Sequence, residues 1–344
     1  MEFAFSSRGA RLHPSAAHHF NTEAASATVH VGSVKLQNFT NTRERVEAVE
    51  NSLRRTNAPC GFRRRMQTRA QAGTTWLGQF NGITPLIRHR ALLWQFIVRN
   101  VELRHKGSHL GLIWSFLNPL LMLGLYVFVF GYVFGGKFGA RPGETRVDYA
   151  LGIFVGLSVF HFLGEVLGVS PTVIVSNPNF VKKVVFPLEI LPVATVGASF
   201  VHFLISIALT VLGIALLGPG PNAGMIWLPV IFLPVLMLAL GLAWFCSALG
   251  TFFRDIGQLT AFLSMALMFA SAVFYPASSI PPAAWQILRF NPLIHAIELS
   301  RATALWGTAI NFHHLAYLYA IGIAALAAGY WVFRKLRPAF ADVL

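Results

Sequence analysis

Six long apolar blocks dominate the chain from residue 111 onward, and short polar stretches separate them. The blocks cover residues 111–134, 149–169, 191–217, 225–252, 256–275 and 315–333. Each is close to, or longer than, the roughly 20 residues that an α-helix needs to cross the hydrocarbon layer of a membrane. The pattern therefore predicts an all-α integral membrane protein with six transmembrane helices.

The segment before the first block, residues 85–103, has a helical apolar pattern instead of a continuous one. The basic residues fall largely outside one face of such a helix. That face carries five apolar residues: Leu92, Leu93, Phe96, Ile97 and Val101. This arrangement is typical of an amphipathic helix that lies in the headgroup layer of a membrane. The alternative is a surface helix of a soluble domain, and the apolar blocks that follow argue against it.

Residues 276–314, between the fifth and sixth blocks, are apolar but interrupted by proline and by charged residues. The interruptions include Pro281, Pro282, Pro292, Glu298 and Arg301. We expect short re-entrant helices here that dip into the outer leaflet without crossing it. Irregular backbone at that depth survives only against protein or a water-lined cavity, so this region is expected to border a pathway.

Residues 1–72 are rich in Ser, Thr, Asn, Ala and Arg, and their apolar residues follow no sustained period. The composition favours a disordered, basic N-terminal tail. A start of translation at Met66 is a second interpretation. An organelle transit peptide is a third, although the glutamates between residues 44 and 50 do not suit one. The predicted organisation is thus a tail and a transmembrane domain at 73–344.

Composition agrees with a lipid environment, because 55% of the residues are hydrophobic and only 12% are charged, against roughly 25% charged in soluble domains. The net charge of +14 does not indicate a nucleic-acid partner, since the basic residues gather between the apolar blocks and at the chain ends. Basic residues concentrate on one set of alternate loops: Arg88, Arg90, Arg99, Arg104, Lys106, Lys182, Lys183, Arg254, Arg334, Lys335 and Arg337. This bias predicts that both termini are cytoplasmic.

Candidate enzyme chemistry is sparse. Cys60 lies in the polar tail and Cys246 in an apolar block, which disfavours a disulfide or a metal site. Residues 131–138, GYVFGGKF, match most of a phosphate-binding P-loop, but they lack its final Ser or Thr and end an apolar block on the predicted outer side. A P-loop also needs a strand before it and a helix after it. We therefore expect no cofactor in this chain and no ATP hydrolysis by it.

Two features inside the second block remain to be explained. Gly152, Gly156, Gly164 and Gly168 share one face of a helix, which favours close helix packing, with the partner helix unassigned. Glu165 is an ionisable group in an apolar block. Such a group is costly in a membrane unless it lines a pathway, pairs with another helix or lies near the cytoplasmic end, and all three interpretations stay open.

Four segments, in order along the chain, resemble the ABC-2 type permeases, most closely the branch that exports lipid-linked polysaccharide such as O-antigen, capsule or teichoic acid. Residues 99–120 resemble the signature that enters the family's first spanning helix: RNVELRHKGSHLGLIWSFLNPL. Residues 177–192 (NPNFVKKVVFPLEILP) and 253–256 (FRDI) are similar to its two cytoplasmic loops. The FYP run at 274–276, with Asn291-Pro292 and Arg301, resembles the region before its last helix.

The resemblance covers about residue 86 to the C-terminus, and it implies a bacterial inner-membrane exporter. Its working form would be a homodimer with two copies of a separate ATPase subunit that binds the ATP. The amphipathic helix would be the family's interface helix, 177–187 would contain the coupling helix, and 278–306 the short gating helices. Alternatives are an ABC-2 exporter of drugs or other lipids, and a membrane enzyme that acts on a polyprenyl-linked sugar.

Three sets of residues are the candidates for function. Contacts to the anionic headgroup of a lipid-linked glycan are assigned to Arg88, Arg90, Arg99 and Arg104. Aromatic residues that would line a channel and stack on sugar rings, or else contact lipid, are Trp114, Phe116, Tyr126 and Phe130. Coupling to the ATPase is assigned to Asn179, Phe180, Lys182, Lys183, Phe186 and Pro187.

Overall fold

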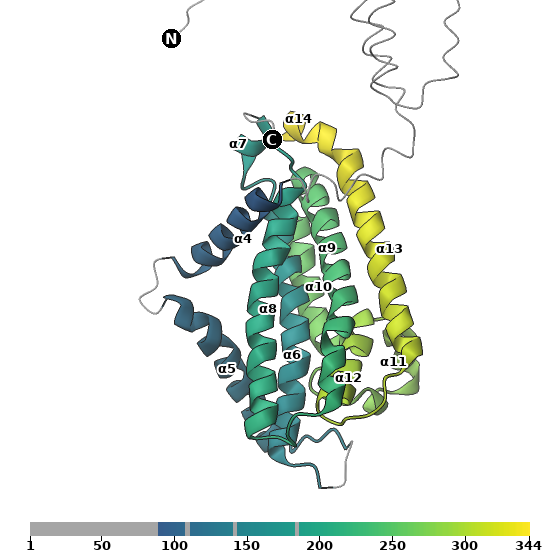
Figure 1. Ribbon diagram of the computed structural model, residues 1–344. Helices are drawn as coiled ribbons and strands as arrows, with labels where there is room; N and C mark the ends of the chain where they lie inside the picture. The colour runs from purple at the N-terminus through teal and green to yellow at the C-terminus, as the bar shows by residue number, and fades with distance from the viewer. Residues whose placement is uncertain (1–88, 107–110, 140–142, 183–185) are drawn as a thin grey trace, which may run out of the picture. The chain divides into compact units, whose positions relative to one another are not determined.

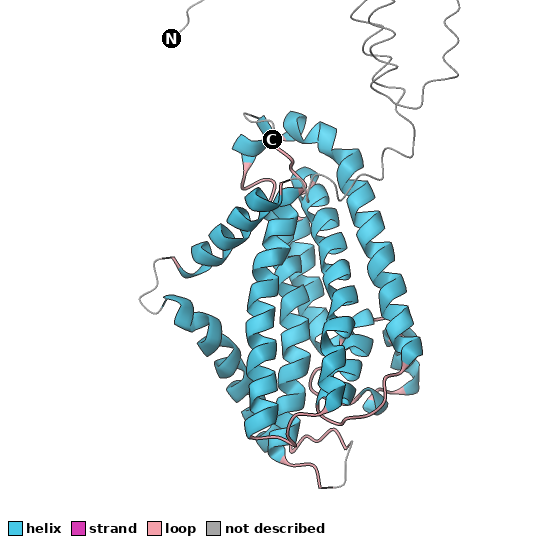
Figure 2. Cartoon of the chain, in the orientation of Figure 1, coloured by secondary structure: helices cyan, strands magenta, loops and turns pink. Residues whose placement is uncertain are grey.

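The computed structural model describes residues 89–344 apart from 107–110, 140–142 and 183–185 (Figure 1). The chain divides into two units, Met1–Gly78 and Gln79–Leu344, and every described residue belongs to the second. The expected tail at 1–72 and the alternative start at Met66 therefore lie outside the described residues. Within the described part, the chain forms helices and loops and no strand (Figure 2).

Five of the apolar blocks form helices long and apolar enough to cross a membrane. The main helices are α5 Trp114–Tyr126, α6 Arg146–Val169, α8 Ile190–Leu216, α9 Leu228–Phe252 and α13 Phe312–Leu336. Short helical turns extend several of them: the π-helix Val127–Val133 after α5, Ser170–Thr172 after α6 and Ala223–Trp227 before α9. The sequence prediction of an all-helical membrane protein is confirmed to this extent.

The block expected at 256–275 forms a shorter helix, α10 Ile256–Ala270, of 15 residues. At 1.5 Å per residue it is about 22 Å long, less than the roughly 30 Å of the hydrocarbon layer. The helix stops where Ser271 leaves the helical conformation and Ala272 takes a positive φ of 53°. Five candidate spans, and not the expected six, are therefore present among the described residues.

Between α10 and α13 the chain forms the short helices that the sequence led us to expect: a turn at Ala277–Ser279, α11 Pro282–Leu288 and α12 Pro292–Ala304. Asn291 begins α12 by accepting a hydrogen bond from the Leu293 amide, with Pro292 in the first turn, where a proline costs no hydrogen bond. Asn311 caps α13 in the same way. Helices α11 and α12 lie at the opposite end of the bundle from α7 Pro178–Lys182 and α14 Phe340–Val343 (Figure 1).

Helix α6 is the centre of the bundle. In its most apolar stretch of 18 residues 78% of the residues are buried, against 6% in the span formed by α5 and the π-helix after it. It begins with a capping box, in which Thr145 and Asp148 each accept a hydrogen bond from the other's backbone amide. The glycine face predicted on it packs closely over only part of its length, and the partners there are now identified. A side chain at Gly156 would meet Arg301 of α12, and one at Gly164 would meet Ser264 of α10, whereas Gly168 faces open space.

Helix α4, Arg90–His105, lies against α8. The residues predicted to form its apolar face are its less exposed residues, and Ile97 packs against Gly197 of α8. Its outward side is mixed, because Trp94 and Val98 are exposed there together with Arg90 and Arg99. The separation of polar and apolar faces is therefore weaker than the sequence pattern indicated.

Candidate functional site

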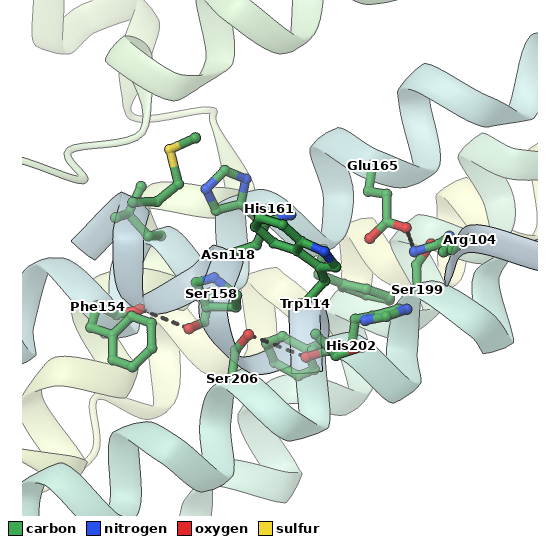
Figure 3. A pocket seen from close by; sticks show the side chains of 16 residues that line it. Arg104, Trp114, Asn118, Phe154, Ser158, His161, Glu165, Ser199, His202 and Ser206 are labelled. Atoms are coloured by element: carbon green, nitrogen blue, oxygen red, sulfur yellow. Dashed lines mark hydrogen bonds and ion pairs between the residues drawn. The ribbon is translucent and has the colours of Figure 1, made fainter. Parts of the chain in front are cut away.

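A pocket of about 570 Å³ lies among the end of α4, α5, α6 and α8 (Figure 3). Its volume is within the range of roughly 300–1,000 Å³ that is usual for ligand sites. The wall combines aromatic rings with a set of polar side chains, although three of its four helices belong to apolar segments. Polar groups at membrane depth are costly and often mark a substrate or ion pathway, so this pocket is the leading candidate site.

The polar side chains come from two facing stripes. Helix α6 supplies Ser158, His161 and Glu165, and α8 supplies Ser199, His202 and Ser206. Spacings of three and four residues place each set on one face of its helix. Helix α5 adds Asn118 and Trp114, which are labelled in Figure 3.

Glu165 pairs with Arg104, which reaches into the pocket from the end of α4 (Figure 3). The Arg104 Nη2 also donates a hydrogen bond of 3.1 Å to the hydroxyl of Ser199 on α8. Arg104 thus joins α4 to both α6 and α8. Of the three interpretations left open for Glu165, pairing across helices is confirmed, and the same carboxylate lines the pocket.

We expect the Arg104–Glu165 pair to show energetic coupling. The two side chains are 26% and 29% exposed, so solvent weakens their attraction, and a coupling of about 1 kcal/mol is expected from a double-mutant cycle. The cycle compares Arg104→Gln, Glu165→Gln and the double variant by denaturant unfolding in detergent. Arg99→Gln is the matched control, because Arg99 is exposed and should combine additively with Glu165→Gln. Additive effects at Arg104 would contradict the pairing.

The other arginines assigned to headgroup contact lie elsewhere on α4. Arg90 and Arg99 are exposed, and Arg99 lies over the ring of Phe96. Arg88 is outside the described residues. Arg104 therefore differs from Arg90 and Arg99, because it faces the pocket and already has an acidic partner.

The four aromatic candidates do not share one environment. Trp114 lines the pocket, and Phe116 is exposed on α5. Tyr126 and Phe130 instead pack on Phe274, with ring centroids 4.9 Å and 4.3 Å away. Only Trp114 is thus placed against the polar stripes.

The segment expected to couple to an ATPase contains α7, which is five residues long. Phe180 and Phe186 turn inward and form a three-ring cluster with Phe96 of α4, with centroids 4.8–5.5 Å apart. Asn179 and Lys182 are exposed, Pro187 is partly buried, and Lys183 lies outside the described residues. The aromatic residues therefore connect α7 to α4, and Asn179 and Lys182 are left available to a partner.

The end of the chain packs beside the same segment. Phe340 and Phe333 are fully buried. Arg337 donates a hydrogen bond of 2.5 Å to Glu189, the residue before α8. A smaller cavity of about 390 Å³ lies between Phe180 and Arg337. The sequence contained no pattern that would connect these two segments.

Arg301 is the most deeply buried charged residue of the described part, with no exposed surface. It donates hydrogen bonds to the carbonyl groups of Gly152 at 2.9 Å, Ala272 at 2.8 Å and Val273, and it forms an ion pair with Glu298. Burial lowers its pKa to about 10, so the guanidinium stays charged at neutral pH. Arg301 thus joins α6, the turn after α10, and α12.

Sequence reasoning named Arg104, Trp114 and Glu165 as candidates, but it assigned no site role to the remaining polar residues of the pocket. A signal was available, because Ser158, His161, Ser199, His202 and Ser206 recur at helical spacing within apolar blocks. The near match to a P-loop at 131–138 follows a helix instead of a strand. Gly136 within it packs against the ring of Tyr149, which gives this glycine a packing role.

Comparison with known proteins supports the family resemblance that the sequence showed. Residues 91–305 match the family model described as ABC-2 type transporter. An O-antigen export system permease protein RfbA of Klebsiella pneumoniae is 28% identical over 247 residues, which are 72% of this chain and 92% of the relative. The protein with the same description in Myxococcus xanthus is 28% identical over 76% of this chain and 98% of its own length. The polysialic acid transport protein KpsM of Escherichia coli is 23% identical over 70% and 92%.

Proposed function

This chain belongs to the ABC-2 type transporter family, and we propose that it is the membrane-embedded permease subunit of an exporter that moves a lipid-linked polysaccharide across the bacterial inner membrane. The observation that carries the proposal is the extent of similarity to polysaccharide export permeases, which covers over 90% of several relatives. The polar pocket within the spanning helices supports transport of a polar cargo.

The proposed topology has six crossings, with α10 and the turn at 271–275 together forming the fifth, and both termini in the cytoplasm. The basic residues of α4, α7 and α13 support this orientation, because cytoplasmic loops are enriched in Lys and Arg. Helices α11 and α12 would then form the re-entrant region in the outer leaflet. The buried Arg301 and the proline-rich connections support a location against protein instead of lipid.

A homodimer would place the translocation path between two copies of this chain. Two helices offer unpartnered apolar faces for that contact. Phe116 and Leu121 are exposed on α5, Phe128 on the π-helix that follows it, and Leu259 and Phe262 on α10. Most other spanning helices bury a larger share of their surface inside one protomer.

Energy would come from two copies of a separate ATPase that dock at α7. Movement of α7 would reach α4 through the Phe96, Phe180 and Phe186 rings, and from α4 it would reach the pocket through Arg104. On the membrane surface, the exposed Arg90 and Arg99 would attract the anionic headgroup of the carrier lipid.

Lys182→Glu is expected to weaken binding of the ATPase and to reduce export. Lys182 is exposed on α7, and reversing its charge should weaken association roughly tenfold, equivalent to about 1.4 kcal/mol. The measurement is the amount of ATPase that co-purifies with the chain at matched expression. Lys335→Glu, which changes an exposed lysine in the last turn of α13, is the control and should retain the ATPase.

The function itself is tested by deleting the gene. Lipid-linked polymer should accumulate inside the cell and disappear from the surface, and the full-length chain supplied in trans should restore it. Sensitivity to drugs with normal surface polymer would instead indicate an exporter of drugs or other lipids. Purified chain that converts a polyprenyl-linked sugar without any ATPase would indicate a membrane enzyme.

A further inference from the structure

We propose that the pocket between α4, α5, α6 and α8 binds a neutral, hydroxyl-rich group, such as a sugar ring, within a single chain. The proposal rests on the proposed function, because it names the residues that would contact the glycan. It adds a subsite that lies inside one protomer, apart from any path between two copies. The argument comes from the direction of the hydrogen bonds in the pocket wall.

The serine hydroxyls of the wall have already used their hydrogens. The Ser158 hydroxyl donates to the Phe154 carbonyl at 2.8 Å, and the Ser206 hydroxyl donates to the His202 carbonyl at 3.2 Å (Figure 3). The Ser199 hydroxyl donates to the Thr195 carbonyl. A hydroxyl has one hydrogen and two lone pairs, so Ser158 and Ser206 can offer a ligand only acceptors.

The charged groups of the pocket also favour a ligand that donates hydrogen bonds. Arg104 is the cation of the wall, and its guanidinium is engaged by Glu165 and Ser199. Glu165 remains an acceptor, since an ionised carboxylate has no hydrogen to give. A phosphate, which offers mainly acceptors and carries negative charge, would meet the lone pairs of Ser158 and Ser206 and the Glu165 carboxylate, and the neutral donors of Asn118 and Trp114 bring no charge to balance it. A sugar hydroxyl can donate to those lone pairs and accept from the Asn118 amide or the Trp114 indole, and the sugar ring carries no charge.

The apolar part of the wall suits the same ligand. Trp114 of α5 lines the pocket together with the polar stripes, and Phe154, Phe162 and Phe203 add three more aromatic rings to the wall. A sugar ring has apolar C–H faces as well as hydroxyls, and aromatic rings pack against such faces while polar groups bind the edges. A fully apolar acyl chain would leave the serine lone pairs and Glu165 without partners, at a cost that a hydroxylated ligand avoids.

The test is protection of an introduced cysteine in the full-length chain in lipid nanodiscs. Ser206→Cys is made together with Cys60→Ser. Ser206 is buried but lines the pocket, whereas Cys246 is buried away from the pocket and stays. Leu204→Cys, exposed on the outer side of α8, is the control. Because the thiolate is the reactive form and needs water, a charged thiol reagent should modify Cys at 206 roughly tenfold faster than Cys at 204.

Two probes of equal chain length separate the ligand classes: hexyl β-D-glucoside and hexyl phosphate. With the glucoside at four times its Kd, mass action predicts roughly fivefold slower modification at position 206. The phosphate should give no protection. Equal or stronger protection by the phosphate would mean an anion site and would overturn the proposal, as would absence of protection by the glucoside or absence of modification at 206.

A second variant keeps the test decisive if Ser206→Cys fails to fold. His161→Cys lies on the α6 wall of the same pocket and is more exposed, and it should show the same pattern of protection. The gene deletion tests the proposed function by surface polymer and does not involve the probes. A chain that restores surface polymer but shows no glucoside protection at either position overturns the pocket proposal alone.

Discussion

Replacing Arg301 by leucine is expected to remove a large share of the stability of the described bundle. The side chain is fully buried, and its loss leaves three carbonyl groups and the Glu298 carboxylate without their donor. Removing one partner of a buried ion pair typically costs about 3–5 kcal/mol, a large share of the roughly 5–15 kcal/mol that stabilises a protein. We expect little folded protein in the membrane.

The measurement is the yield of monodisperse chain after extraction, followed by thermal unfolding in detergent. Arg289→Leu is the matched control, because Arg289 is exposed only twelve residues earlier on the same outer segment. Its yield should stay close to that of the unchanged protein. Arg301→Lys should recover little, since an ammonium lacks the planar fork that reaches several carbonyls at once. Normal yield of Arg301→Leu would contradict the structural role.

Replacing Gly329 by alanine is expected to force α9 and α13 apart. A Cβ at Gly329 would run into the backbone carbonyl of Gly241, and one at Gly241 would run into that of Ala325. Backbone on both sides cannot move aside as a side chain can, so overpacking should cost about 1–3 kcal/mol or more. The cost should exceed the roughly 1 kcal/mol that alanine gains over glycine in a helix.

Gly257→Ala separates the effect of helix propensity from that of the close contact between α9 and α13. Gly257 also lies in a helix, and a Cβ there would meet open space. This variant should unfold at the same temperature as the unchanged chain or a higher one, whereas Gly329→Ala should unfold at a lower temperature. Similar shifts for both variants would mean that helix propensity, and not the contact between α9 and α13, decides the result.

The early end of α10 illustrates what periodicity cannot show. The block 256–275 contains no charged residue, and no proline precedes Pro276 to stop a helix. In the folded chain, side chains distant in sequence satisfy the carbonyls at its end. Asn291 donates to Ala270 at 3.0 Å, Arg301 to Ala272 and Val273, and Tyr149 to Phe274 at 2.9 Å. These donors replace the hydrogen bonds that further helical turns would have made.

The pocket shows the same division between local and distant information. Helical spacing in the sequence was enough to place Ser158, His161 and Glu165 on one face, and Ser199, His202 and Ser206 on another. The sequence did not show that these faces meet, or that Arg104 would pair with Glu165 and Ser199 on two other helices. Such contacts depend on helices 40 to 100 residues apart, and hydropathy carries no information about them.

The sequence alone determined the helical membrane character, five of the spanning helices, the short helices before the last span and the resemblance to ABC-2 permeases. The lipid environment dictates the helical character and the spanning helices, because a spanning segment must be long, apolar and hydrogen-bonded within itself. Tertiary structure alone decided where α10 ends, which residues face the pocket, how Arg301 is buried and how closely α9 approaches α13. Those outcomes depend on donors, charges and backbone surfaces brought together from distant segments, and only the packed chain specifies them.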